Sequence, residues 1–140
     1  MIVLRRAELN DAGRLFDWRN DPETIAASIN SEAVKSADHL VWLSKSLENP
    51  SRELLIAMDG SFCVGTVRFD KSEERTEVSW TVNPAFRKQG IGSAMLREAV
   101  NGRSNLFACI KSANTASQKI AKRAGFILAK DGDLQEWIRA

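Results

Sequence analysis

The sequence lacks several side chains on which whole classes of function depend. It has no tyrosine and a single histidine, His39, which cannot build a multi-histidine metal site. Its two cysteines, Cys63 and Cys109, lie in apolar stretches and form no CxxC pair. This context predicts buried free thiols rather than a zinc site or a disulfide framework. We therefore expect no bound metal.

Long apolar runs and a strong charge of one sign are also absent. No run approaches the roughly 20 apolar residues that span a bilayer, and the N-terminal residues show no signal-peptide pattern. The net charge is only +2, with acidic and basic residues interspersed, whereas nucleic-acid binders usually carry a clustered basic excess. These absences predict a cytoplasmic protein without a membrane or nucleic-acid partner.

The residues that are present fit one globular domain over residues 1–140, with 44% hydrophobic and 27% charged side chains. Hydrophobic spacing predicts strands at 2–4, 53–58, 62–69, 76–82, 106–110, 126–129 and 134–138. Alternation along 76–82 places the apolar Val78, Trp80 and Val82 on one face of that strand. It predicts helices from the cap at Asn10-Asp11 to the break at Asn20, and at 36–47, 90–103 and 114–124. The order is that of an α+β fold built on one mixed sheet.

The segment from Val82 to Arg97 has the pattern of an anion site. A strand ends at Asn83-Pro84, the basic pair Arg87-Lys88 follows, and Gly90 and Gly92 open a helix. Glycines allow close approach of a ligand, and free N–H groups at a helix start hold an anion. The spacing matches neither a Walker loop nor a dinucleotide-binding turn. It predicts a phosphate or pyrophosphate cradle.

Two motifs in this order resemble those of the GNAT superfamily of acyl-CoA N-acyltransferases. Arg87-Lys88-Gln89-Gly90-Ile91-Gly92 matches the R/Q-x-x-G-x-G/A motif of that family. Asn114-Thr115-Ala116-Ser117 followed by Ala124-Gly125-Phe126 resembles its second motif, N-x-x-S/A…G-F. The resemblance covers the chain from about Glu53 to its end.

The resemblance implies a mixed, mostly antiparallel central sheet flanked by helices and splayed beside the strand at 76–82 to admit coenzyme A. Acetyl-CoA would be the acetyl donor, with pantetheine pairing near Thr81 and Val82. The pyrophosphate would lie on the turn and helix start, and a later helix would add one contact. The implied coenzyme residues are Thr81, Val82, Arg87, Lys88, Gln89, Gly90, Ile91, Gly92, Ser93 and Asn114.

Direct transfer to an amine needs a base for the ammonium and an acid for the leaving thiolate. Glu77 is the first candidate base, acting through a water that Ser79 could hold; alternatively it is a solvated strand residue. The acid of the family is usually a tyrosine four residues before Gly125, where this chain has Ala121. Ser117 is the candidate for stabilising the thiolate, or its hydroxyl bonds back to its own helix.

The acceptor site is predicted in the first half of the chain. Trp18, Arg19, Asn20 and His39 are the candidate substrate residues, although Trp18 also fits a core position. The W-R-N and H-x-x-W order resembles acetyltransferases that modify UDP-linked amino sugars in pseudaminic-acid-type pathways. A small-molecule amine of that kind is the expected acceptor. Protein N-terminal or ribosomal-protein amines, and a coenzyme-binding protein without catalysis, are the alternatives. The C-terminal edge strand could support a homodimer.

Overall fold

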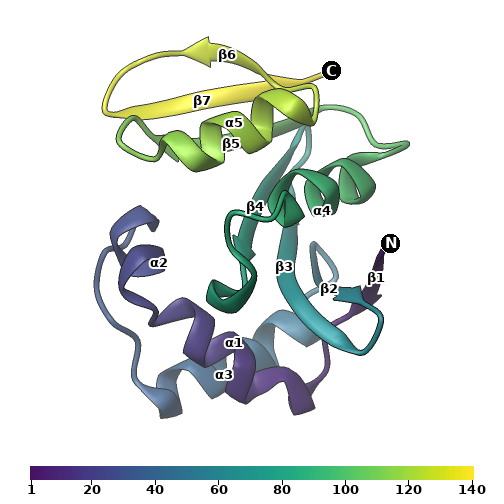
Figure 1. Ribbon diagram of the computed structural model, residues 1–140, viewed down its shortest axis with the longest axis vertical. Helices are drawn as coiled ribbons and strands as arrows, with labels where there is room; N and C mark the ends of the chain where they lie inside the picture. Colours follow the sequence, from purple (N-terminus) through teal and green to yellow (C-terminus); the bar gives the residue numbers. More distant parts are fainter.

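One mixed sheet of seven strands organises the computed structural model, which describes residues 1–140 (Figure 1). The order across the sheet is β1-β2-β3-β4-β5-β7-β6, and only β4 and β5 run parallel. This confirms the predicted α+β fold with a mostly antiparallel sheet. The strands are β1 (Ile2–Arg6), β2 (Arg52–Asp59), β3 (Phe62–Lys71), β4 (Thr76–Val82), β5 (Leu106–Lys111), β6 (Ile127–Lys130) and β7 (Leu134–Arg139).

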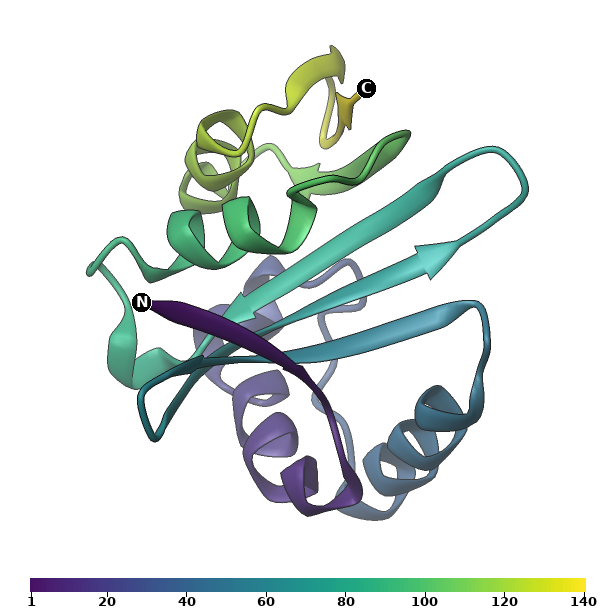
Figure 2. The same cartoon turned by 90° about the vertical axis from the view of Figure 1, so that its right-hand side faces the viewer.

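Helices cover both faces of the sheet (Figure 2). The first three helices lie on one face, and the last two lie on the other. The helices are α1 (Ala12–Arg19), α2 (Pro22–Ala27), α3 (Ser36–Glu48), α4 (Ile91–Val100) and α5 (Thr115–Arg123). The short α2 is missing from the predicted order. It begins because Asp21 caps it, accepting a hydrogen bond from the Thr24 N–H, and because Pro22 suits its first turn.

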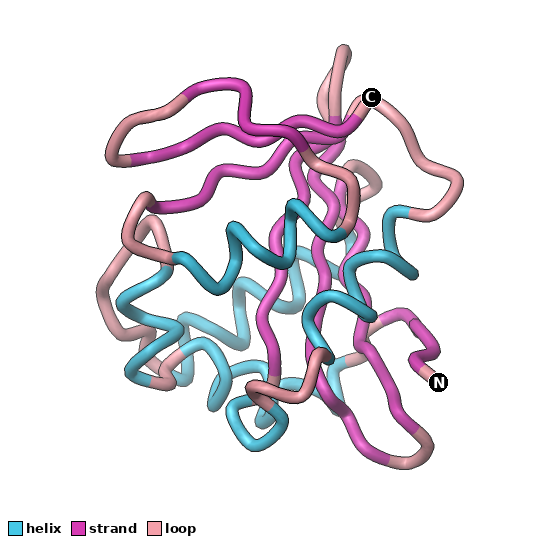
Figure 3. The backbone as a smooth tube through the Cα atoms, turned by 45° about the horizontal axis from the view of Figure 1, so that its top comes forward, coloured by secondary structure: helices cyan, strands magenta, loops and turns pink.

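The sheet divides between β4 and β5, as the resemblance implied. The two strands pair only at Thr76↔Leu106 and Glu77↔Phe107, so β4 has no partner on that side from Val78 onward. In Figure 1, β3 and β4 run vertically, whereas β5, β7 and β6 run across the top. The tube view in Figure 3 shows the same divergence, with α5 passing beside the opening. The division creates a split along the last residues of β4.

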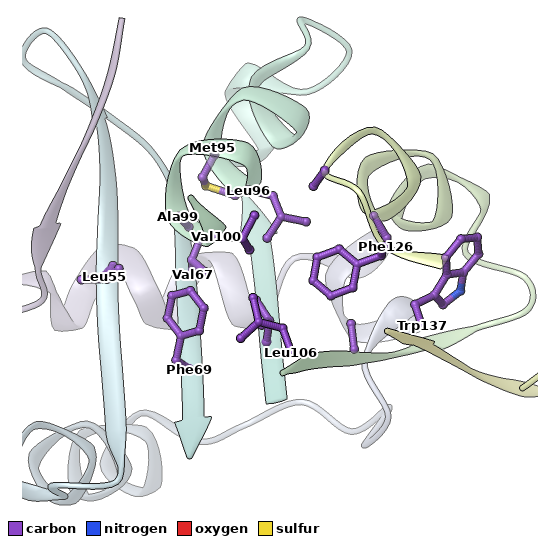
Figure 4. Close-up of a cluster of buried hydrophobic side chains, with 14 of the residues drawn as sticks. Leu55, Val67, Phe69, Met95, Leu96, Ala99, Val100, Leu106, Phe126 and Trp137 are labelled. Atoms are coloured by element: carbon purple, nitrogen blue, oxygen red, sulfur yellow. The ribbon is translucent and has the colours of Figure 1, made fainter. Parts of the chain in front are cut away.

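Two hydrophobic clusters hold these layers together. The larger lies between the sheet and α4 and α5, and includes Met95, Leu96 and Phe126 (Figure 4). The predicted apolar face of β4 is confirmed, since Val78 is buried in this cluster and Trp80 and Val82 pack against it. The smaller cluster lies under α1 and α3. Its members are Ala7, Leu15, Trp18, Leu43, Leu54 and Ile56.

The two cysteines are free, as predicted, but only half-buried. Alternation along β5 explains the partial exposure of Cys109, because Leu106, Ala108 and Ile110 occupy the core-facing positions. No helix is long and apolar enough to cross a membrane. No group of three histidine, cysteine or acidic side chains is arranged to hold a metal ion.

Candidate active site

The turn before α4 has the backbone of an anion cradle. Lys88 and Gly90 both adopt positive φ, at 62° and 76°, and α4 starts directly afterwards at Ile91. A side chain at position 90 would meet no atom within 4 Å, so its backbone conformation is what favours glycine there. The Ala94 N–H bonds the Gly90 carbonyl, whereas N–H groups in the first turn of a helix have no acceptor within it. The turn therefore presents free donors at a positive helix end.

Gly92, the second glycine of the motif, lies in the first turn of α4. It is buried, and a Cβ there would lie 2.4 Å from the Ile120 Cδ1 atom and 3.2 Å from the Val82 Cγ2 atom. The glycine thus lets α4 pack closely on α5 and β4. Ile91 packs against the core and Ser93 is buried, while Lys88 and Gln89 remain exposed.

Arg87 forms hydrogen bonds and ion pairs with residues at the start of α2. Its guanidinium lies 2.5 Å from the Asp21 carboxylate, 3.0 Å from the Glu23 carboxylate and 3.0 Å from the Thr24 hydroxyl. Burial alone would raise the pKa of Asp21, but the hydrogen bond from Arg87 and the Thr24 N–H lower it overall. The cation expected in the cradle is therefore paired with the start of α2.

Backbone groups of β4 face the split. The Asn83 N–H donates to the Val64 carbonyl at 2.8 Å, so the odd-numbered residues of β4 turn their backbone bonds toward β3. By alternation, Trp80 and Val82 turn theirs toward the split. Thr81, predicted to pair with pantetheine, instead has its backbone directed at Thr66 of β3. The Val82 N–H therefore points into the split.

The second motif forms the start of α5. The Asn114 side chain caps the helix by accepting a hydrogen bond from the Ser117 N–H at 3.1 Å. Ser117 is half-buried one turn before Ile120, which packs on Gly92. Ala121, at the position of the family tyrosine, is fully buried and cannot reach a ligand. Ser117 is thus the hydroxyl of α5 closest in position to the region where α4 and β4 meet.

A cavity of about 350 Å³ adjoins β4, with Ser79, Trp80 and Thr81 of that strand in its lining. Three of the four predicted acceptor residues, Trp18, Arg19 and His39, line it together with residues of β2, β3 and β4. Its lining consists of Leu15, Trp18, Arg19, Asn30, Val34, His39, Trp42, Leu54, Thr66, Arg68, Ser79, Trp80 and Thr81. The first half of the chain therefore brings its aromatic and basic residues to the end of β4.

Asn20, the fourth predicted acceptor residue, does not line the cavity. Its amide donates to the Val34 carbonyl and accepts from the Val34 N–H, each at 2.7 Å. These two bonds fix the segment between α2 and α3, which contributes Val34 to the cavity wall. Asn20 is accordingly a positioning residue, because its hydrogen-bonding groups are used within the chain.

His39 is buried between two aromatic rings. Its ring centroid lies 5.7 Å from that of Phe16 and 5.3 Å from that of Trp42. Burial lowers the pKa of His39, and the nearby positive charge of Arg19 lowers it further. The imidazole is therefore neutral at physiological pH, and its charge does not contribute to the cavity.

Glu77 lies at the closed end of the split, where β4 still pairs with β5. It is about 16 Å along the strand from Val82, and it does not line the cavity. Burial first, and the negative charge of Glu77 second, raise the pKa of the Cys109 thiol. Ser79, on the same face of β4, lies between Glu77 and Thr81 and does line the cavity.

Among the cavity residues that the sequence did not assign to a site, Trp80 and Arg68 carry hydrogen-bond donors. Trp80 was assigned to the apolar face of β4, yet its indole N–H is buried without a hydrogen-bond partner. Arg68 belongs to β3 and lines the cavity beside Trp42. The alternation of β4 predicted where Trp80 lies, but only the tertiary structure shows that its N–H has no acceptor.

The fold is that of solved acetyltransferases. The structure of yncA from Salmonella typhimurium, which contains acetyl-CoA, matches with a TM-score of 0.77 at 22% identity over 97% of this chain and 91% of that one. Spermidine N-acetyltransferase from Vibrio cholerae, solved with CoA and spermine, matches with a TM-score of 0.84 at 12% identity over 97% and 93% of the two chains. At these identities the likeness shows a shared fold.

A family model described as the acetyltransferase (GNAT) domain matches residues 2–127. The chain belongs to this GNAT acetyltransferase family. Among curated proteins, the uncharacterized N-acetyltransferase YfmK of Bacillus subtilis is 28% identical over 92 residues. That match spans 62% of this chain and 62% of the length of YfmK.

Proposed function

We propose that this chain transfers the acetyl group of acetyl-CoA directly to the primary amine of a nucleotide-linked amino sugar. The observation that carries the proposal is the aromatic and basic cavity at the end of β4, next to a sheet that is split beside the same residues. The split supports entry of the coenzyme from the α4 side, and the cavity supports entry of the acceptor from the α1 side.

The residues present fit acetyl-CoA. Free N–H groups at the start of α4 suit its pyrophosphate, and the exposed Lys88 adds a positive charge. The unpaired backbone of Trp80 and Val82 suits its pantetheine amides. When bound, the coenzyme supplies an activated thioester. The remaining chemistry belongs to the side chains and backbone groups of this chain.

Four groups share the proton and charge transfers. Glu77 takes the proton of the substrate ammonium through a chain of waters along β4, one of them held by Ser79, which lies on the same face nearer the cavity. The Val82 N–H stabilises negative charge on the carbonyl oxygen during attack. Ser117 donates a hydrogen bond to the departing thiolate in place of the tyrosine that this chain lacks.

The acceptor residues form a compact set. Trp18 and His39 provide walls of the cavity, Arg19 provides a cation, and Asn20 holds the segment that closes one side. Such a set suits the rings and the oxygen-rich linkage of a nucleotide sugar better than an extended peptide. We also propose a cytoplasmic location, which the two free thiols support.

The exposed apolar side chains of Ile127, Leu134 and Ile138 support a homodimer formed through the β6 edge. Sedimentation of the purified protein tests this part. A single species with the mass of one chain at all concentrations would remove the dimer from the proposal without affecting the chemistry.

The activity is tested by incubating the protein and acetyl-CoA with UDP-linked 4-amino sugars, N-terminal peptides and polyamines, and following release of the free thiol. We expect turnover on the UDP-linked amino sugar. Turnover on peptides alone would replace the acceptor class. Binding of acetyl-CoA without turnover on any amine would instead assign a coenzyme-binding protein.

A further inference from the structure

Two buried donors in this protein have no acceptor, and both belong to residues that line the same cavity. They are the Nη1 atom of Arg19 and the indole Nε1 atom of Trp80. Buried polar groups in native proteins are almost always hydrogen-bonded, so an exception calls for a partner. Because the two atoms come from α1 and β4, their coincidence in one cavity indicates a ligand that supplies oxygen acceptors.

The charge of the cavity wall points the same way. The lining contains Arg19 and Arg68 but no aspartate or glutamate. Arg68 shares the carboxylate of Asp70 with Arg52, so two guanidinium groups have one counter-ion between them. Arg19 bonds only the Asn30 carbonyl, at 2.9 Å, and forms no ion pair. The wall therefore carries uncompensated positive charge.

The aromatic residues of the cavity do not form a binding site for a cationic ligand. An aromatic cage binds an ammonium group through open ring faces. Here the Arg52 and Arg68 guanidinium groups each lie 5.8 Å from the centroid of the Trp42 ring. His39 packs against the same ring with its centroid 5.3 Å away. Trp42 is thus already in contact with two cations of the chain itself.

We propose, on the basis of the acceptor site proposed above, that the cavity selects an amine carrying a phosphate or carboxylate group. Arg19 and Trp80 donate hydrogen bonds to the oxygens of that group, and the reacting amine is directed toward the end of β4. Polycationic amines are excluded, because the wall offers them no carboxylate. In this respect the chain departs from its structural neighbour that was solved with spermine.

The test compares matched acceptors. The first pair is an ω-amino carboxylate and the diamine of the same chain length, and the second is a UDP-linked amino sugar and the same sugar without the nucleotide. For each, kcat/KM is measured with acetyl-CoA for the wild type and the variants Arg19→Met, Arg19→Lys and Trp80→Phe. Arg97→Met, which removes an exposed cation from α4, is the control.

We expect the anionic member of at least one pair to be preferred. Arg19→Met should lower its kcat/KM by about 30-fold, the loss typical of a charged hydrogen bond, and lower that of the uncharged or cationic member far less, so that the preference is lost. Arg19→Lys keeps the charge and should recover part of the loss, while Trp80→Phe keeps the ring and should lose about threefold. Preference within the first pair assigns a carboxylate, and within the second a phosphate.

Equal use of both members of each pair, or a preference for the diamine, would overturn the proposal while leaving the N-acetyltransferase activity in place. A binding measurement detects the opposite case, in which the selectivity is correct but the proposed reaction is not. Titration of the wild type with UDP, the ω-amino carboxylate and spermidine, followed by tryptophan fluorescence, needs no turnover. Anion binding that depends on Arg19 without turnover would uphold the selectivity and contradict the proposed reaction. Acetyl-CoA affinity of each variant shows that it is folded.

Discussion

The Arg87 guanidinium lies 2.5 Å from the carboxylate of Asp21, which is 66 residues earlier in the chain. This ion pair connects the turn before α4 with the N-cap residue of α2. It joins the two halves of the proposed active site, since α4 begins the coenzyme cradle and α2 precedes the loop that walls the acceptor cavity. It also neutralises a cation that the sequence motif suggested was available to the coenzyme.

Asp21→Asn should therefore have two opposite effects. Asparagine still caps α2, but it removes the charge that holds Arg87, so Arg87 becomes free to meet the pyrophosphate. We expect the Kd for acetyl-CoA to fall by about threefold and the free energy of unfolding to fall by about 1 kcal/mol. Calorimetry and urea unfolding measure the two quantities. Unchanged affinity with lowered stability would show that Arg87 only anchors α2.

Gly92→Ala tests whether the second glycine of the motif serves helix packing. The added Cβ meets the end of the Ile120 side chain, so the substitution should cost about 1 kcal/mol of unfolding free energy. In an Ile120→Val background, which removes the Cδ1 atom, the same change should become neutral or stabilising, because alanine favours helix. Urea unfolding of the four proteins of this double-mutant cycle gives the coupling. Additive effects in the cycle would contradict the packing role.

The buried carboxylate of Asp11 predicts a specific acid sensitivity. Burial alone would raise its pKa, but hydrogen bonds from Arg5, the Glu8 N–H and Arg14 lower it overall from the ordinary value of 3.8. A carboxylate whose pKa is lower in the folded state stabilises the fold above pH 3.8. This stabilisation is lost as the pH falls through the pKa of the folded state. Asp11→Asn should lower the free energy of unfolding by about 2 kcal/mol at pH 7. The loss is smaller than for a fully buried ion pair, because both arginines are more than a third exposed.

The stability gap between wild type and Asp11→Asn should close on acidification below about pH 4. Thermal unfolding across this range measures it. A gap that stays constant from neutral to acidic pH would show that the ion cluster does not contribute through its charge.

The fold was largely predictable because its signals are local. Alternation placed Val78, Trp80 and Val82 on the core face of β4, and the glycines and basic residues located the start of α4. The helix predicted at 90–103 ends at Val100 in the structure. It stops before Gly102, which adopts a φ of 78°. α2 was missed because six residues are too few for a helical period to be recognised.

The site was predictable only in part, because its contacts join distant segments. Sequence reasoning brought Trp18, Arg19 and His39 to the acceptor side, and all three line the cavity. The sequence does not reveal that the Asn20 side chain hydrogen-bonds both backbone groups of Val34, or that Arg87 pairs with Asp21. Those partners are chosen by tertiary packing, and no spacing in the sequence encodes them.

Glu77 and His39 can be separated as proton acceptors by their pH–rate profiles. Glu77→Gln should lower kcat by about 100-fold and leave the affinity for acetyl-CoA unchanged, because it removes a base that lies outside both binding regions. His39→Gln is the matched comparison, since His39 lines the cavity and is neutral. If the acidic limb of the kcat profile disappears in His39→Gln and persists in Glu77→Gln, His39 is the base.

The central claim is that coenzyme A is held by the start of α4 and the split edge of β4. An amide proton–nitrogen NMR spectrum of the wild type, titrated with acetyl-CoA, tests it without any substitution. The largest shifts should fall on the amides from Lys88 to Ser93 and on Val82, with small changes in α1 and α3. Large shifts confined to α1, α3 and the cavity wall, with the amides of the turn unmoved, would contradict it.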